Sequence, residues 1–249
     1  MNVLIFAAGL GTRLKPLTDT MPKALVPING KPLLQHLIEK LQTYGLPLNV
    51  VVNIHHFGQQ IIDFVNGNNQ FGTTIQFSDE RDMLLETGGG LKKAAPLFGN
   101  ISSADSNPIL IHNVDILSNI NLAEFYNSHK ESDAAATLLV SQRKTKRYLL
   151  FDKTRRLVGW TNIETGEMRS PYRNLKVEEC SAYAFSGIHI VSPSLLPMLD
   201  SWEGKFSIID FYLSVCDKTV IKADFRPDLK LLDVGKLDSI KQAECFFDE

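Results

Sequence analysis

"VLIFAAGLGTRLKPLTDTMPK", residues 3–23, joins a continuous apolar run to a loop that holds two glycines and several cations. The run at residues 3–8 stops at Gly9, which predicts a strand buried on both faces of a parallel sheet. Gly9 and Gly11 would let the backbone approach a ligand and present N–H groups to anionic oxygens. The stretch therefore predicts a buried first strand that ends in an anion-binding loop.

The cations of this loop suit a polyanion, although the common phosphate motifs do not fit. Arg13 can hold a phosphate bidentately, and Lys15 or Lys23 would act as a point charge. The alternative is a glycine-rich turn with solvated cations. A dinucleotide fingerprint would need glycine in place of Leu14, and the "GKP" that begins at Gly30 lacks the hydroxyl of a Walker A loop. The proline-restricted "MPK" that holds Lys23 favours ligand binding.

Outward from this stretch, apolar runs alternate with helical patterns. The first half predicts strands at residues 3–8, 49–54, 74–77 and 108–112, with helices that begin at Lys31-Pro32 and cover 59–65 and 91–97. This alternation predicts a mostly parallel sheet with helices on both faces. After Asp133 the predicted strands, at 134–140, 148–151, 157–160 and 183–191, have little helix between them, so a more antiparallel half is expected. Amphipathic helices are predicted at 206–216 and 237–247.

Composition sets limits on the class of protein. The chain has 249 residues, 44% of them hydrophobic, and a formal net charge of -2, which disfavours disorder and a broad nucleic-acid surface. No apolar run reaches the length of a membrane span, and no leader segment is recognised, so a cytoplasmic location without a membrane partner is expected. Three widely spaced cysteines without a C-x-x-C indicate neither a disulfide framework nor a zinc site. One domain over residues 1–249 is expected, as a monomer or small homo-oligomer.

The stretch "AAGLGTRLKPLTDTMPKALVPINGKPLL", residues 7–34, resembles the signature of the sugar-1-phosphate nucleotidylyltransferases, G-x-G-T-R-[LM]-x-P-L-T followed by a P-K lysine. "ETGGG", "HNVD", "YAFSGIHIV" and "LLDVGKLDSIKQAE" extend the resemblance over nearly the whole chain. It is similar to the short branch that includes mannose-1-phosphate guanylyltransferases and N-acetylmuramate-1-phosphate uridylyltransferases. The resemblance implies a Rossmann-like α/β fold and transfer of a nucleotidyl group from an NTP to a sugar 1-phosphate. Residues 1–133 would then form the nucleotide-binding half, and residues 134–249 the sugar-binding half.

The resemblance also implies roles for particular residues. Arg13 would neutralise the leaving pyrophosphate, and Lys23 would bind the α-phosphate as the second catalytic cation. The residues expected to bind the nucleotide are Ala7, Ala8, Gly9, Leu10, Gly11, Thr12, Asn53, Glu86, Thr87, Gly88 and Gly89. The backbone amides from Ala8 to Thr12 would hold the phosphates. The alternative for the three glycines after Thr87 is a glycine-rich helix cap, and the neighbouring pair His55-His56 is expected to be a surface or packing feature.

Two aspartates are the candidate metal ligands. Asp115 follows the strand "PILIH", and Asp233 follows the apolar run "LKLL". Carboxylates at the ends of distant strands can share one Mg²⁺, with Mn²⁺ as a possible substitute. In the resembling family these positions lie in N-G-D and D-x-G-T motifs, from which the chain departs at Val114 and Lys236. The alternative is that each aspartate caps a turn.

The sugar side is expected to involve Asn113, Trp160, Asn162, Ser186 and Gly187. Many relatives carry an E-K-P lysine that contacts the sugar phosphate, and here "GWTNIE" lacks it. Another cation would have to contact the sugar phosphate in place of this lysine. The candidates are Lys153, Arg169 and Arg173, and the two arginines are favoured. The two alternative functions are a nucleotide-sugar glycosyltransferase and a catalytically silent sugar-nucleotide-binding regulatory protein.

Overall fold

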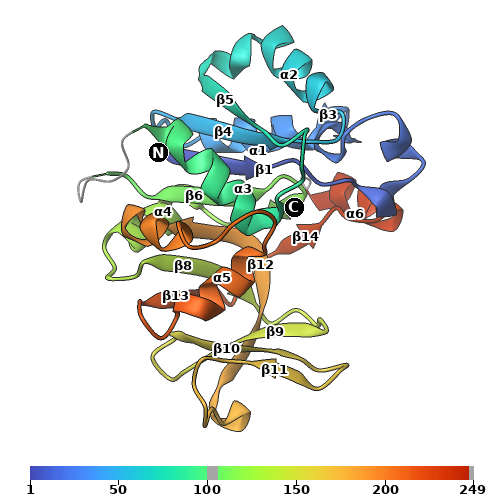
Figure 1. The fold of residues 1–249 in the computed structure, drawn as a ribbon. Helices are drawn as coiled ribbons and strands as arrows, with labels where there is room; N and C mark the ends of the chain where they lie inside the picture. Colours follow the sequence, from blue (N-terminus) through green and yellow to red (C-terminus); the bar gives the residue numbers. More distant parts are fainter. Residues whose placement is uncertain (100–105, 247–249) are drawn as a thin grey trace.

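Strand β1, Asn2–Phe6, lies in the parallel part of the main sheet, between β4 and β6. The fold is described from a computed structural model, which covers residues 1–99 and 106–246. Within that part the main sheet has ten strands, in the order β11-β10-β9-β12-β6-β1-β4-β5, with β8 and β13 joined beside β12 (Figure 1). The strands are β1 (Asn2–Phe6), β4 (Asn49–Ile54), β5 (Thr74–Asp79), β6 (Ile109–Asn113), β8 (Ala136–Ser141), β9 (Arg147–Phe151), β10 (Leu157–Asn162), β11 (Glu167–Arg169), β12 (Ser181–Val191) and β13 (Ile221–Phe225).

The direction of pairing changes along the sheet as expected. The strand pairs β6–β1, β1–β4 and β4–β5 are parallel, whereas β12 runs antiparallel to β6, β8 and β9, and β9–β10–β11 form an antiparallel meander. The helices are α1 (Leu33–Gln42), α2 (Gly58–Gly67), α3 (Glu86–Ala94), α4 (Leu122–Lys130), α5 (Ile208–Val215) and α6 (Leu237–Phe246). The mixed α/β architecture predicted from the sequence is therefore confirmed. None of the described helices has the length and apolar character that crossing a membrane requires.

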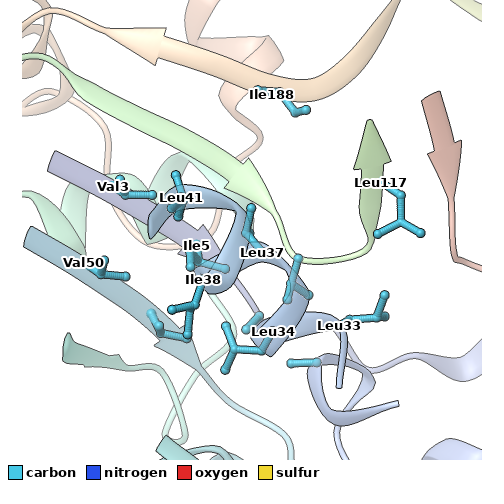
Figure 2. Packing of buried hydrophobic residues seen from close by; sticks show 14 of the residues in the cluster. Val3, Ile5, Leu33, Leu34, Leu37, Ile38, Leu41, Val50, Leu117 and Ile188 are labelled. Carbon is cyan, nitrogen blue, oxygen red and sulfur yellow. The ribbon is translucent and has the colours of Figure 1, made fainter. Parts of the chain in front are cut away.

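Helix α1 shows why this sheet is stable. Its apolar positions recur at helical spacing, so they lie on one face and pack on the parallel strands. Leu33, Leu34, Leu37, Ile38 and Leu41 are all buried. Figure 2 shows them beside Val3, Ile5 and Val50 of the parallel strands. Burial of each such side chain contributes about 2 kcal/mol, and this core fixes the strand ends where the loops begin.

Helix α3 corrects one prediction. The sequence pattern placed a helix at 91–97 after a glycine loop, but α3 spans Glu86–Ala94 and contains all three glycines. A Cβ on Gly88 would lie 2.4 Å from the Phe206 ring, and one on Gly89 would lie 2.6 Å from the Gly204 carbonyl oxygen. Close packing explains these glycines, although glycine is a poor helix former.

Smaller boundary differences have local causes. Lys31-Pro32 does not start a helix: it forms strand β3, which pairs with β2 (Pro27–Ile28), and α1 begins at Leu33. Pro32 has ψ 146°, an extended conformation outside the helix. Strand β1 ends at Phe6 rather than at residue 8. The expected helix end at residue 247 lies outside the described residues.

The carboxyl-terminal segment returns to the first half of the chain. Strand β14 (Leu231–Asp233) pairs antiparallel with β7 (Ile116–Ser118), and α6 lies beside β14 (Figure 1). The side-chain nitrogen Nδ2 of Asn29 also donates to the carbonyl oxygen of Glu244, at 2.8 Å. The two halves at 1–133 and 134–249 stay a prediction, and residues of the second half complete the surface around the end of β6.

Candidate active site

The loop after β1 is exposed, and its turns depend on glycine. Gly9 and Leu10 are exposed, and residues Thr12–Leu14 form a 3-10 helix. Gly11 has φ 63°, and a Cβ there would lie 2.8 Å from Cγ2 of Thr18. The Thr18 hydroxyl donates to the Gly11 carbonyl oxygen at 2.8 Å, which holds this turn closed. The loop therefore places its open backbone at the carboxyl end of the parallel strands, as expected.

Asn53 connects this loop to the neighbouring strands. Its Oδ1 accepts from the backbone amides of Ala7, at 2.6 Å, and Ala8, at 3.1 Å. Its Nδ2 donates to Oε1 of the fully buried Glu80, at 2.9 Å. Oε2 of Glu80 accepts from the Leu85 amide at 3.0 Å. Ala7 and Ala8 thus use their amides internally, which leaves the phosphate contacts predicted for the loop to the amides of Gly9–Thr12.

The segment expected beside the nucleotide begins at Glu86. Glu86 has φ 59° and its carboxylate pairs with Lys205 at 3.3 Å. The Thr87 hydroxyl accepts from the Ile208 amide at 3.0 Å, at the start of α5. The amides of Gly88 and Gly89 both donate to the carbonyl oxygen of residue 206, at 2.9 and 3.4 Å. Glu86 and Thr87 line the cavity described below. Gly88 and Gly89 instead connect α3 to the segment before α5.

Asp115 and Asp233 form a cluster after the end of β6, called here the acidic corner. The carbonyl oxygen of Asp115 accepts from the Val234 amide at 2.8 Å, and Asp233 is the ladder partner of Ile116. Strands β7 and β14 therefore bring the two predicted metal ligands to neighbouring positions. A Cβ at Gly235 would lie 2.6 Å from Oδ1 of Asp233 and 2.8 Å from a terminal guanidinium nitrogen of Arg13, so both side chains converge there.

Lys23 completes this corner. Its ammonium group donates to Oδ2 of Asp115, and the side chains of Lys23 and Asp115 are only 10% and 20% exposed.

His112 supports the backbone of Asn113, because its Nδ1 lies 2.8 Å from the Asn113 carbonyl oxygen. Burial lowers the pKa of His112 to about 4, so this imidazole is neutral at pH 7 and donates to that carbonyl.

These elements enclose a cavity of about 350 Å³. It is lined by Phe6, Ala7, Ala8, Gly9, Lys23, Asn53, Glu80, Leu84, Glu86, Thr87, Asn113, Val114, Asp115 and Ser207. Most predicted nucleotide residues are thus brought together. Arg13 and Asp233 lie outside this lining, beside Gly235. The described residues contain no group of three or more histidine, cysteine, aspartate or glutamate side chains that could hold a metal ion.

A second cavity, of about 510 Å³, shares Ser207 with the first. It contains the predicted sugar residues Trp160 and Asn162. Ser186 is buried, and its hydroxyl accepts from the Ile188 amide at 3.1 Å. Gly187 has φ 82°, and a Cβ there would lie 2.5 Å from Nδ2 of Asn113, so it supports Asn113 rather than lining a cavity.

The structure separates the three candidates for the missing lysine. Arg169 lines the second cavity, where its guanidinium lies 4.0 Å from the centroid of Trp160. Lys153 and Arg173 line a different cavity. The second cavity also contains Arg143 and Arg147, which are not among the residues predicted from the sequence, although residues 143–147 hold four cations.

The sequence and the fold are similar to those of known nucleotidyltransferases. A family model described as "Nucleotidyl transferase" matches residues 2–249. The chain is 30% identical over 215 residues to the N-acetylmuramate alpha-1-phosphate uridylyltransferase of Caulobacter vibrioides, covering 84% of this chain and 81% of that protein. It is 29% identical over 203 residues to the mannose-1-phosphate guanyltransferase of Yarrowia lipolytica, covering 80% of this chain and 52% of that protein. The crystal structure of HddC from Yersinia pseudotuberculosis complexed with GMP-PN matches with a TM-score of 0.73, 24% identity and 99% of both chains.

Proposed function

Since this chain belongs to the nucleotidyl transferase family, we propose that it transfers a nucleotidyl group from a nucleoside triphosphate to a sugar 1-phosphate. The observation that most strongly supports this location for the reaction is the arrangement of Lys23, Asp115 and Asp233. Lys23 is paired with Asp115, both residues line the first cavity, and Asp233 is on the strand that pairs with β7. A glycosyltransferase is not favoured, because the family model extends over residues 2–249.

In this proposal, an oxygen of the sugar 1-phosphate attacks the α-phosphorus of the NTP in line. The bond from that phosphorus to the β-phosphate bridging oxygen breaks, and pyrophosphate leaves. The attacking phosphate is already ionised at neutral pH, so no general base is required. Positioning and charge neutralisation supply the rate enhancement.

The residues divide this work between them. Amides of Gly9–Thr12 bind phosphate oxygens, and the exposed Arg13 neutralises the leaving pyrophosphate. Lys23 leaves Asp115 and binds the α-phosphate as charge accumulates. Asn53 and Glu80 hold the loop and the base-side segment in register through their hydrogen bonds.

The acidic corner fits a hard divalent cation. Asp115 and Asp233 offer carboxylate oxygens from neighbouring strand positions, and Mg²⁺ typically uses one or two carboxylates together with substrate phosphates. Asp115 and Asp233 would hold Mg²⁺ or Mn²⁺, which would supply positive charge to the phosphates. The names of the relatives point to UTP or GTP as donor and to N-acetylmuramate or mannose as the sugar. A cytoplasmic location and a monomer or small homo-oligomer stay predictions.

The test is a pyrophosphate-release screen of four NTPs against a panel of sugar 1-phosphates, with Mg²⁺ or EDTA. Turnover of at least one pair is expected with Mg²⁺ only. Asp115→Asn and Asp233→Asn should each reduce kcat by on the order of a hundredfold, because the developing charge loses its stabilisation. Full turnover in EDTA, or full activity of either variant, would contradict the metal assignment. Pyrophosphate release from no pair would contradict the proposed function.

A further inference from the structure

The second cavity has an antiparallel floor whose side chains follow from the strand register. Asn162 of β10 pairs with Arg147 of β9 and Glu167 of β11, and Trp160 pairs with Leu149 and Arg169. Residues directly opposite on neighbouring strands point to the same face, as do residues two apart on one strand. All six side chains line the cavity of about 510 Å³. The floor is therefore a built surface with an indole, an amide and guanidinium groups.

Arg169 is already neutralised on this floor. Its guanidinium pairs with Asp210 and, at 3.5 Å, with Glu167, and it lies over the Trp160 ring. These two are the only carboxylates in the described lining of the cavity. Arg169 is thus held in place by its neighbours, and its charge is largely compensated.

Arg143 and Arg147 have no such compensation. Within residues 1–99 and 106–246, neither guanidinium has a carboxylate partner. Arg143 donates to the Phe185 carbonyl oxygen at 3.2 Å, which positions its head at the cavity. Two uncompensated guanidinium groups facing one cavity suit an anionic ligand, since arginine binds carboxylates in a planar, bidentate fashion.

The position of these arginines separates them from the reacting phosphates. Lys23 and Asp115 line the first cavity, and the arginines line the second. Ser207 lines both cavities, and β12 leads from Phe185 to Gly187, which packs on Asn113 of the first cavity. A sugar whose phosphate is bound at the acidic corner would extend past Ser207, with its distal substituents toward the arginines.

We propose that Arg143 and Arg147 form a subsite for a second acidic group on the sugar, so that the acceptor is a sugar 1-phosphate that also carries a carboxylate. This proposal rests on the proposed function and specifies its acceptor. Trp160 and the other aromatic walls contact the ring, Asn162 contacts its hydroxyl or amide groups, and the two guanidinium groups bind the carboxylate.

The test uses pairs of acceptors that differ only by a carboxylate: N-acetylmuramate 1-phosphate against N-acetylglucosamine 1-phosphate, and glucuronate 1-phosphate against glucose 1-phosphate. The wild-type protein should show kcat/KM about a hundredfold higher for the acidic member of one pair, the size of two charge-assisted contacts of about tenfold each. Arg143→Gln and Arg147→Gln should each lower that acidic-to-neutral ratio about tenfold, and the double variant should bring it close to one. Lys144→Gln is the matched control, because Lys144 is an exposed cation of the same loop that does not line the cavity.

Two outcomes would overturn the proposal while leaving the proposed function intact. They are a wild-type preference for the acidic member of neither pair, and an unchanged ratio in the double variant, which includes an equal loss for both members. Equal loss would mean that the arginines hold the 1-phosphate. If no acceptor is turned over, the proposed function fails, and ligand-observed NMR with free N-acetylmuramate and N-acetylglucosamine tests the subsite. Binding of the acid alone, abolished in the double variant, would uphold the subsite, and any other pattern would overturn it.

Discussion

Replacement of Lys23 by methionine tests the acidic corner most directly. The ammonium of Lys23 and Oδ2 of Asp115 form an ion pair whose side chains are 10% and 20% exposed. Removing one partner leaves a largely buried carboxylate without its cation, which costs about 2 kcal/mol. We therefore expect the free energy of unfolding, measured by urea denaturation without metal, to fall by about 2 kcal/mol.

The same pair has a consequence for metal binding. A divalent cation that binds Asp115 must displace Lys23, so the wild-type protein without nucleotide loses about the free energy of that pair. About 2 kcal/mol corresponds to roughly thirtyfold in affinity. Lys23→Met should therefore bind Mn²⁺ about thirtyfold more tightly in the absence of nucleotide, and added Mn²⁺ should restore its stability. Its kcat should nevertheless fall by on the order of a hundredfold, because the α-phosphate loses its cation.

Electron paramagnetic resonance of free Mn²⁺ during a titration measures this affinity. Lys15→Met is the control, because it removes the same charge from the same loop. The ammonium group of Lys15 pairs instead with Oδ1 of Asp19, 2.9 Å away, at an exposed position. The control should match the wild-type Mn²⁺ affinity within about threefold, since exposed pairs contribute little. Equal Mn²⁺ affinity in Lys23→Met and the wild-type protein would refute the reasoning that lysine and metal compete for Asp115.

Three further predictions concern the supporting structure. Gly88→Ala should lower the free energy of unfolding by about 1–3 kcal/mol, because its Cβ would lie 2.4 Å from a phenylalanine ring, whereas Gly67→Ala, with nothing within 4 Å, should be neutral or stabilising in the same urea titration. Asn53→Ala should cost about 3 kcal/mol and raise KM for the NTP, because two loop amides lose their acceptor; an unchanged KM would contradict its role in holding the loop. Burial lowers the pKa of His112 and His129 to about 4 each, below the unfolded value of about 6.5. The free energy of unfolding should therefore be highest above pH 6.5 and fall by about 1.4 kcal/mol per pH unit for each histidine as pH drops toward 4. Urea titrations from pH 7.5 to 5 should show a weaker pH dependence of this free energy in His129→Gln than in the wild-type protein.

The parallel half of the fold could be predicted because its signals are local. Continuous apolar runs bounded by turn residues identify strands at 49–54 and 108–112, and the face of α1 follows from helical spacing. Helix α3 could not be predicted in the same way. Its three glycines have low helix propensity, and the packing against Phe206 that decides their conformation joins residues more than a hundred positions apart in the chain.

Part of the local geometry around the candidate site could be anticipated from the sequence. Both aspartates were selected by their place after apolar runs, but the short strands β7 and β14 that make them neighbours have no clear periodicity. Glu80 was not found, because a single acidic residue in a polar turn carries no signal until its burial is known. Arg143 and Arg147 did carry one, as part of a dense basic run, and only the structure shows that they face a cavity.

The distribution of charge reconciles an acidic chain with an anionic substrate. The formal net charge is -2, so the protein as a whole does not attract polyanions. In the described residues, Arg13 and Lys23 lie by the acidic corner, whereas Arg143, Arg147 and the carboxylate-paired Arg169 line the second cavity. Salt screens exposed charges over about 10 Å, so each cation acts mainly on the part of a ligand that it touches. An acceptor with acidic groups at both ends would therefore gain from both groups of cations. If the proposed sites are right, the local placement of cations, rather than their total number, determines which anions this chain binds.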